Sequence, residues 1–125
     1  MRQKESGQAM VETALVVPIL IALMMGTFSL GQVFSAKLVL INAVREGARV
    51  GSLGRPSFTI QDTVHRYLAS AGIASESVAV LISGAQAKSG DSISVKVTYP
   101  IKLAVPLPGM PDPLPLDSLA VMRIE

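Results

Sequence analysis

One carboxylate, that of Glu12, stands at the start of a long apolar run, where its charge needs a partner. No Asp, Glu, Lys or Arg occurs in residues 13–36. Hydrolysis of the peptide bond after Gly7 would make Gln8 the first residue and would create a free α-amino group. Because a carboxylate in lipid is costly without a partner, we expect the amine of a neighbouring subunit to pair with Glu12. Glu12 is also a favourable charge near a helix N-terminus, and the two roles are compatible.

Other chemically active side chains are too few for a catalytic or metal site. The chain has no Cys and one His, His65, which we expect to lie exposed on a helix. No Gly-rich phosphate loop follows a strand, and no carboxylates cluster. The net charge of +2, with few aromatic residues, gives no support for nucleic-acid binding. We therefore predict that the protein is not an enzyme and has no cofactor, no metal and no small-molecule substrate.

The uncharged run is long enough to cross a membrane. About 20 apolar residues span a bilayer core. A buried core helix is the alternative, but a remainder this small could not surround a helix that is apolar on all sides. Arg2 and Lys4 precede the run, so the positive-inside tendency places the N-terminus in the cytoplasm and the residues after Ala36 on the far side.

Three interpretations of this segment remain. A cleaved secretory signal would have a shorter apolar core and a small-x-small site, for which residues 33–36 are a poor match. An uncleaved signal anchor is physically sound but unspecific. Processing after Gly7, as in a prepilin-type signal, accounts for the Gly-x4-Glu spacing and is favoured.

The pattern resembles that of a known family. Residues 7–18 resemble the start of TadE-like proteins, the pilin-like minor components of the tight-adherence (Flp-type) pilus machinery, and residues 42–49 resemble that family's second signature. Residues 119–125 are weakly similar to its usual ending. Thr13 stands where many members carry an aromatic residue. The major Flp pilin is much shorter and lacks a globular part.

The resemblance implies a minor pilin or pseudopilin that supports pilus biogenesis and adhesion. A prepilin peptidase would remove the leader, residues 1–7, by cutting between Gly7 and Gln8. Residues 8–36 would form the transmembrane and assembly helix, and residues 37–125 the exported domain. The protein would lie in the inner membrane, with its N-terminus cytoplasmic, and would bind other pilin-like subunits and the assembly platform, with incorporation into the pilus left open. The alternative is an uncleaved single-pass membrane-anchored binding module with an extracytoplasmic domain.

The expected fold is a pilin-like α+β fold with a long N-terminal helix, a second short helix and a small antiparallel sheet of about three strands. The long helix should cover residues 8–49, roughly 60 Å at 1.5 Å per residue. Pro18 should bend it locally. Its outer half should support the domain through an apolar stripe with a helical period. That stripe consists of Phe34, Leu38, Ile41, Val44 and Ala48.

Charged residues near the end of this helix allow two interpretations. Arg45 and Arg49 share a face, and Glu46 can pair with Arg49. A partner-docking surface is one interpretation, and a solvated helix face is the favoured one. Gly47 is unfavourable inside a helix and would allow the domain to pack closely.

The residues after the long helix predict the short helix and the sheet. Thr59 and Asp62 form a capping-box pattern, and Gly72 is a stop signal. The helix should bury Ile60, Val64, Tyr67, Leu68 and Ala71. Strands are expected over residues 78–82, 93–99 and 119–124, with a hairpin loop over 83–91. The proline-rich residues 106–115 should form a loop that returns the chain to the sheet.

Overall fold

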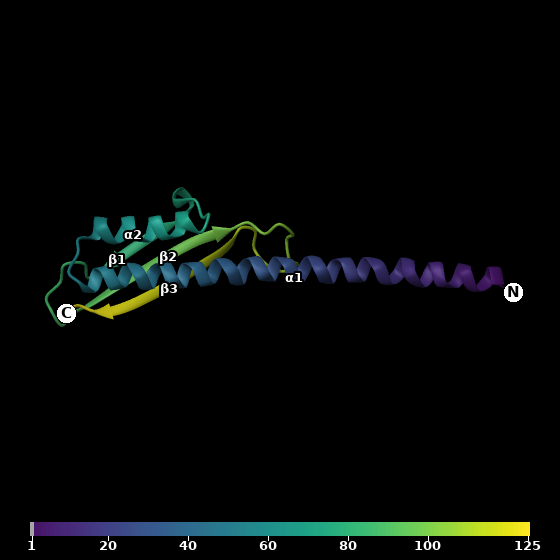
Figure 1. The fold of residues 1–125 in the computed structure, drawn as a ribbon, viewed down its shortest axis with the longest axis horizontal. Helices are drawn as coiled ribbons and strands as arrows, with labels where there is room; N and C mark the ends of the chain where they lie inside the picture. The colour runs from purple at the N-terminus through teal and green to yellow at the C-terminus, as the bar shows by residue number, and fades with distance from the viewer. Residues whose placement is uncertain (1) are drawn as a thin grey trace.

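The computed structural model describes the backbone of residues 2–125 and the side chains of residues 6–125, so Met1 and the side chains of residues 2–5 lie outside it. The elements in chain order are α1 (Arg2–Ser52), α2 (Ser57–Ser70), a 3-10 turn η1 (Ser75–Ser77), β1 (Ala79–Ser83), β2 (Ser92–Ile101) and β3 (Leu114–Arg123). Figure 1 shows α2 and the sheet beside the C-terminal half of α1, while the N-terminal half projects alone. The predicted α+β class, with three antiparallel strands, is confirmed.

The long helix is longer than the sequence indicated. It has 51 residues, about 75 Å at 1.5 Å per residue, and runs from the leader to three residues beyond Arg49. Pro18 lies inside it, and the helix continues on both sides. The local bend at Pro18 stays a prediction.

The sheet has the order β1-β2-β3 and buries one face. The alternation predicted for β2 is confirmed, because Ile93, Val95 and Val97 are fully buried. β3 begins at Leu114, earlier than predicted, and includes Pro115, which the sequence placed in a loop. The strand tolerates this proline because β3 lies at the edge of the sheet, where one row of backbone donors needs no ladder partner.

The stripe of α1 that faces the domain is not the predicted one. Val44 and Ala48 are buried as expected, but Phe34 and Leu38 are 67% and 61% exposed, and Ile41 is half-buried. The buried apolar side chains on α1 are Ala36, Leu40, Ala43, Val44 and Ala48. The prediction was wrong because residues on this helix are apolar on several faces, so a helical period alone cannot choose among them. The domain packs on the face with the smaller side chains, where α2 and the sheet approach most closely.

Gly47 shows how close this approach is. A Cβ built on Gly47 would lie 2.6 Å from Cγ2 of Val64 on α2 and 3.6 Å from Cγ1 of Val95 on β2. Val64 is fully buried and β-branched, so its side chain has little freedom to move away. The close packing that the sequence predicted at Gly47 is therefore present.

We expect Gly47→Ala to lower the free energy of unfolding of the domain by about 1–2 kcal/mol, because overpacking outweighs the better helix propensity of alanine. Denaturation of the detergent-solubilised chain, followed by the fluorescence of its two tyrosines, measures this. Gly31→Ala is the matched control, since a Cβ at Gly31 meets nothing within 4 Å. Equal stability of the two variants would contradict the packing argument.

The second helix begins two residues before the predicted start. The carbonyl of Pro56 accepts the amides of Thr59 at 3.0 Å and Ile60 at 3.3 Å, so the helix opens at Ser57. No side chain caps it, and the capping box proposed for Thr59 and Asp62 is wrong because Thr59 already lies inside the helix.

The end of α2 agrees with the predicted stop. Gly72 has a φ of +80°, and the amides of Gly72 and Ile73 donate to the carbonyls of Ala69 and Leu68, each at 3.0 Å. This is the Schellman arrangement, in which a left-handed glycine closes the last turn.

The face of α2 is mostly as predicted. Ile60, Val64 and Leu68 are buried and Tyr67 is half-buried, but Ala71 is exposed because it follows the last helical residue. His65 is half-buried and not exposed, since it lies at the border of the packed face. Its Nδ1 is buried and has no hydrogen-bond partner among the described residues.

Candidate functional site

The N-terminal half of α1 is bare and apolar. None of residues 6–28 is buried. The helix is long and apolar enough to cross a membrane: its most apolar window has a mean hydropathy of 2.2, and only 6% of that window is buried in the fold. A core helix of a soluble protein would instead be covered by the rest of the chain. So large an apolar surface must be covered by something outside this chain.

The first contact between the domain and α1, counted from the N-terminus, is at Ser29. Ser29 is fully buried, and its hydroxyl donates to the carbonyl of Val105 at 3.1 Å. One turn later, Oε1 of Gln32 accepts the amide of Ala104 at 3.3 Å. The ammonium of Lys37 donates to the carbonyl of Asp117 on β3. Contact with the domain thus begins inside the segment that the sequence assigned to the membrane.

The length that remains bare fits a bilayer. Residues 8–28 rise about 30 Å at 1.5 Å per residue. The hydrocarbon core of a typical bilayer is also about 30 Å thick. A helix that enters lipid at Gln8 would therefore leave it at about Ser29, where the domain begins.

The predicted processing site and Glu12 both lie on the bare segment. Glu12 is exposed, and its carboxylate has no hydrogen bond or ion pair within the part of the chain that the structure describes. Its surroundings are an apolar shallow groove lined by Ala9, Thr13, Val16, Val17 and Leu20. A Cβ at Gly7 would meet nothing within 4 Å. Packing against the described residues 6–125 therefore does not require a glycine at residue 7.

Two hydroxyls on the same segment are already satisfied. Oγ1 of Thr13 donates to the carbonyl of Ala9 at 2.8 Å, and Oγ1 of Thr27 donates to that of Leu23 at 2.9 Å. Such bonds within one helix let a threonine lie in lipid at little cost. Glu12 is the only charged residue in residues 6–28 and is the one for which a partner is needed.

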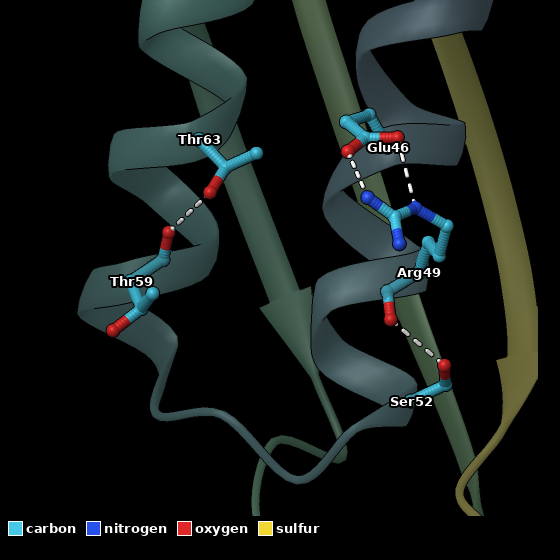
Figure 2. A network of polar contacts seen from close by, with 5 residues as sticks. All are labelled: Glu46, Arg49, Ser52, Thr59 and Thr63. Atoms are coloured by element: carbon cyan, nitrogen blue, oxygen red, sulfur yellow. Dashed lines mark hydrogen bonds and ion pairs between the residues drawn. The ribbon is translucent and has the colours of Figure 1, made fainter.

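The charged group at the other end of α1 is paired within the helix, as Figure 2 shows. Nε and Nη2 of Arg49 donate to Oε2 and Oε1 of Glu46 at 3.1 and 2.5 Å. This hydrogen bond holds the pKa of the Glu46 carboxyl below its ordinary value, against the effect of burial and with the help of the Arg49 charge. The same bond raises the pKa of Arg49. Arg45 is exposed.

The polar contacts around this pair do not join the two helices. Ser52 donates to the carbonyl of Arg49 at 2.8 Å within α1, and Thr63 donates to that of Thr59 at 2.9 Å within α2 (Figure 2). Arg45 and Glu12 are 33 positions apart on one helix, about 50 Å at 1.5 Å per residue. The fold therefore does not bring the two candidate groups together.

The sequence analysis missed the residues that attach the domain to the helix. The sequence analysis predicted no role for Ser29, Gln32 or Lys37. The available signal was that Ser29 and Gln32 lie one turn apart within otherwise apolar surroundings. No group of three or more potential metal ligands occurs among the described residues.

Comparison with known proteins agrees with the resemblance seen in the sequence. Residues 7–49 match the family model described as TadE-like protein, which confirms that resemblance for this part of the chain. The match covers most of α1 and ends before α2. No similar curated protein and no similar solved structure is found.

Proposed function

We propose that this chain is a minor pilin-like subunit of a tight-adherence-type pilus, processed after Gly7 and assembled through the bare half of α1. The observation that carries the proposal is Glu12, whose carboxylate has no partner among the described residues. It lies at the start of an uncovered apolar helix, five positions after Gly7 and within a match to TadE-like proteins. Each of these features has a separate physical role in assembly.

Glu12 supplies the specificity of contact. Apolar helices associate in lipid through van der Waals packing, and smooth leucine and valine surfaces define axial register poorly. A buried charge pair between Glu12 and the new amine at Gln8 of a neighbouring subunit defines one register, because any other leaves both charges unpaired. The same amine does not exist before processing, so the uncut chain lacks this contact.

Gly7 serves the processing step. A peptidase must open the helix at the bond it cuts, and glycine weakens a helix by about 1 kcal/mol relative to alanine. Since Gly7 has no packing role among the residues that the structure describes, recognition and cleavage by a prepilin peptidase account for it.

The basic residues before the apolar run predict the orientation of the chain in the membrane. Arg2 and Lys4 precede the apolar run, and the positive-inside tendency keeps them in the cytoplasm. The domain then lies outside the inner membrane, where it faces other pilin-like subunits, the assembly platform or the pilus. Arg45 and the Glu46–Arg49 pair lie on this outer part, and we propose a solvated helix face for them.

An uncleaved anchor that carries a binding module would keep the same helix. It would not need a free amine beside Glu12, so removal of the Glu12 carboxylate separates the two functions. If the chain is a pilus subunit, the variant should abolish filaments but still insert into the membrane. If it is a binding module, the variant should change neither the number of filaments nor insertion. Filament counts and membrane fractionation of the Glu12 variant provide the test.

A further inference from the structure

The loop between β2 and β3 is the part of the domain nearest the bare half of α1. Figure 1 shows it reaching along α1 from the sheet toward the N-terminal half. The bonds of Ser29 and Gln32 to Val105 and Ala104 hold it against the helix, and Leu103 beside them is buried. Two hydrogen bonds therefore set the position of residues 104 and 105 relative to α1.

That position coincides with the expected surface of the bilayer. The bare residues 8–28 rise about 30 Å, which equals the thickness of the hydrocarbon core. Ser29 then lies at the outer boundary between acyl chains and headgroups. Val105, whose carbonyl accepts the hydrogen bond of Ser29, must lie at the same level.

The side chains of the loop suit that boundary. Met110 is 47% exposed, although nothing in its local structure requires an apolar residue there, and Val105 and Leu107 are half-buried. The loop thus offers apolar side chains that the fold covers only in part. Lys102 is exposed where the loop leaves β2, and a cation near the headgroups is attracted to lipid phosphates.

The backbone of the loop also suits a medium with little water. Pro106, Pro108, Pro111 and Pro113 have no amide hydrogen, so they lose no hydrogen bond to water on leaving it. The amide of Met110 is satisfied by the carbonyl of Leu107 at 3.2 Å. Fewer unpaired donors lower the cost of moving this loop from water into the interface.

We propose that residues 103–111 form an interfacial membrane contact, with the exposed Met110 in the boundary between headgroups and acyl chains of the outer leaflet. The proposal rests on the membrane insertion of α1 under the proposed function. It gives the domain a second attachment to the bilayer beside the helix. Two attachments restrict rotation and tilt of the domain, which a single helix leaves free.

Tryptophan fluorescence tests the proposal directly, because the chain has no Trp of its own. Three single variants of the full chain are reconstituted in vesicles of phosphatidylcholine and phosphatidylglycerol, with lipids brominated near the headgroup end of the acyl chains. Met110→Trp reports the loop, Leu20→Trp reports the helix, and Ser89→Trp in the exposed β1–β2 loop is the control away from the membrane. All three positions are exposed, so the substitutions leave the core unchanged.

The expected result is that Met110→Trp loses about half of its emission to the brominated lipid and shifts to the blue, because indole rings settle in this boundary. Ser89→Trp should be unaffected. Quenching of Leu20→Trp without quenching of Met110→Trp would overturn the loop contact and leave insertion of the helix standing. An unquenched Leu20→Trp would overturn the loop contact and the membrane insertion of α1, since the helix itself would then lie outside lipid. No partner protein is present, so a loop that contacts only a neighbouring subunit gives the unquenched result at Met110.

Discussion

Cells that produce the Glu12→Ala variant in place of the wild-type protein should make no pili, although the variant still reaches the membrane. The substitution removes the one charge from the bare apolar segment, so insertion becomes easier. The neighbouring subunit's amine then stays buried without a partner. Breaking one side of a buried charge pair costs about 3–5 kcal/mol, which lowers the assembly constant by a hundredfold or more. Filament counts by electron microscopy, with immunoblots of membrane fractions, measure the two effects separately.

Thr27→Ala is the matched control for this experiment. Thr27 is an exposed polar residue on the same bare segment, but its hydroxyl bonds within its own helix. Its loss should leave piliation unchanged. Normal piliation in Glu12→Ala would contradict the assembly role of the carboxylate and would favour the membrane-anchored binding module.

Leu40→Ala should destabilise the domain by about 2–5 kcal/mol, the usual cost of a cavity in place of a buried leucine. Leu40 is fully buried and lies on α1, where the core contains residues from α1, α2 and the sheet. The anchor helix thus contributes directly to the core of the domain. Tyrosine fluorescence follows the loss during denaturation in detergent, since Tyr67 and Tyr99 both pack against this core.

Leu38→Ala is an internal control of the same residue type on the same helix. Leu38 is 61% exposed, so its truncation should change the free energy of unfolding by less than about 0.5 kcal/mol. If the two variants were equally stable, the face that α1 turns toward the domain would have been assigned wrongly. If Leu38→Ala alone were destabilised, the predicted stripe through Phe34 and Leu38 would be the true one.

Much of the fold could be predicted because its signals are local. The strict alternation around Val95 indicated β2, and Gly72 indicated the end of α2. The packed face of α1 could not be predicted, because apolar residues on several faces allow more than one helical stripe and only tertiary contact selects among them. The start of β3 was missed because Pro115 reads as a loop residue, and its position at a sheet edge is a property of the whole sheet.

The site could be predicted in one part and not in another. Gly7 and Glu12 are close in sequence, so their spacing was visible, and the match over residues 7–49 supports that resemblance. The attachment at Ser29 joins residues 76 positions apart, Ser29 and Val105, and no local pattern predicts such a pairing. The level at which the domain meets the helix therefore required the structure.

The most direct test of the central claim is the intact mass and N-terminal sequence of the protein recovered from membranes. We predict a chain that begins at Gln8, which establishes processing after Gly7 and places a free amine near Glu12. A chain that begins at Met1 would contradict the pilin-type account and leave an uncleaved anchor. A chain that begins near Ala36 would contradict the pilin-type account and the uncleaved anchor alike, because it would have lost the membrane helix altogether.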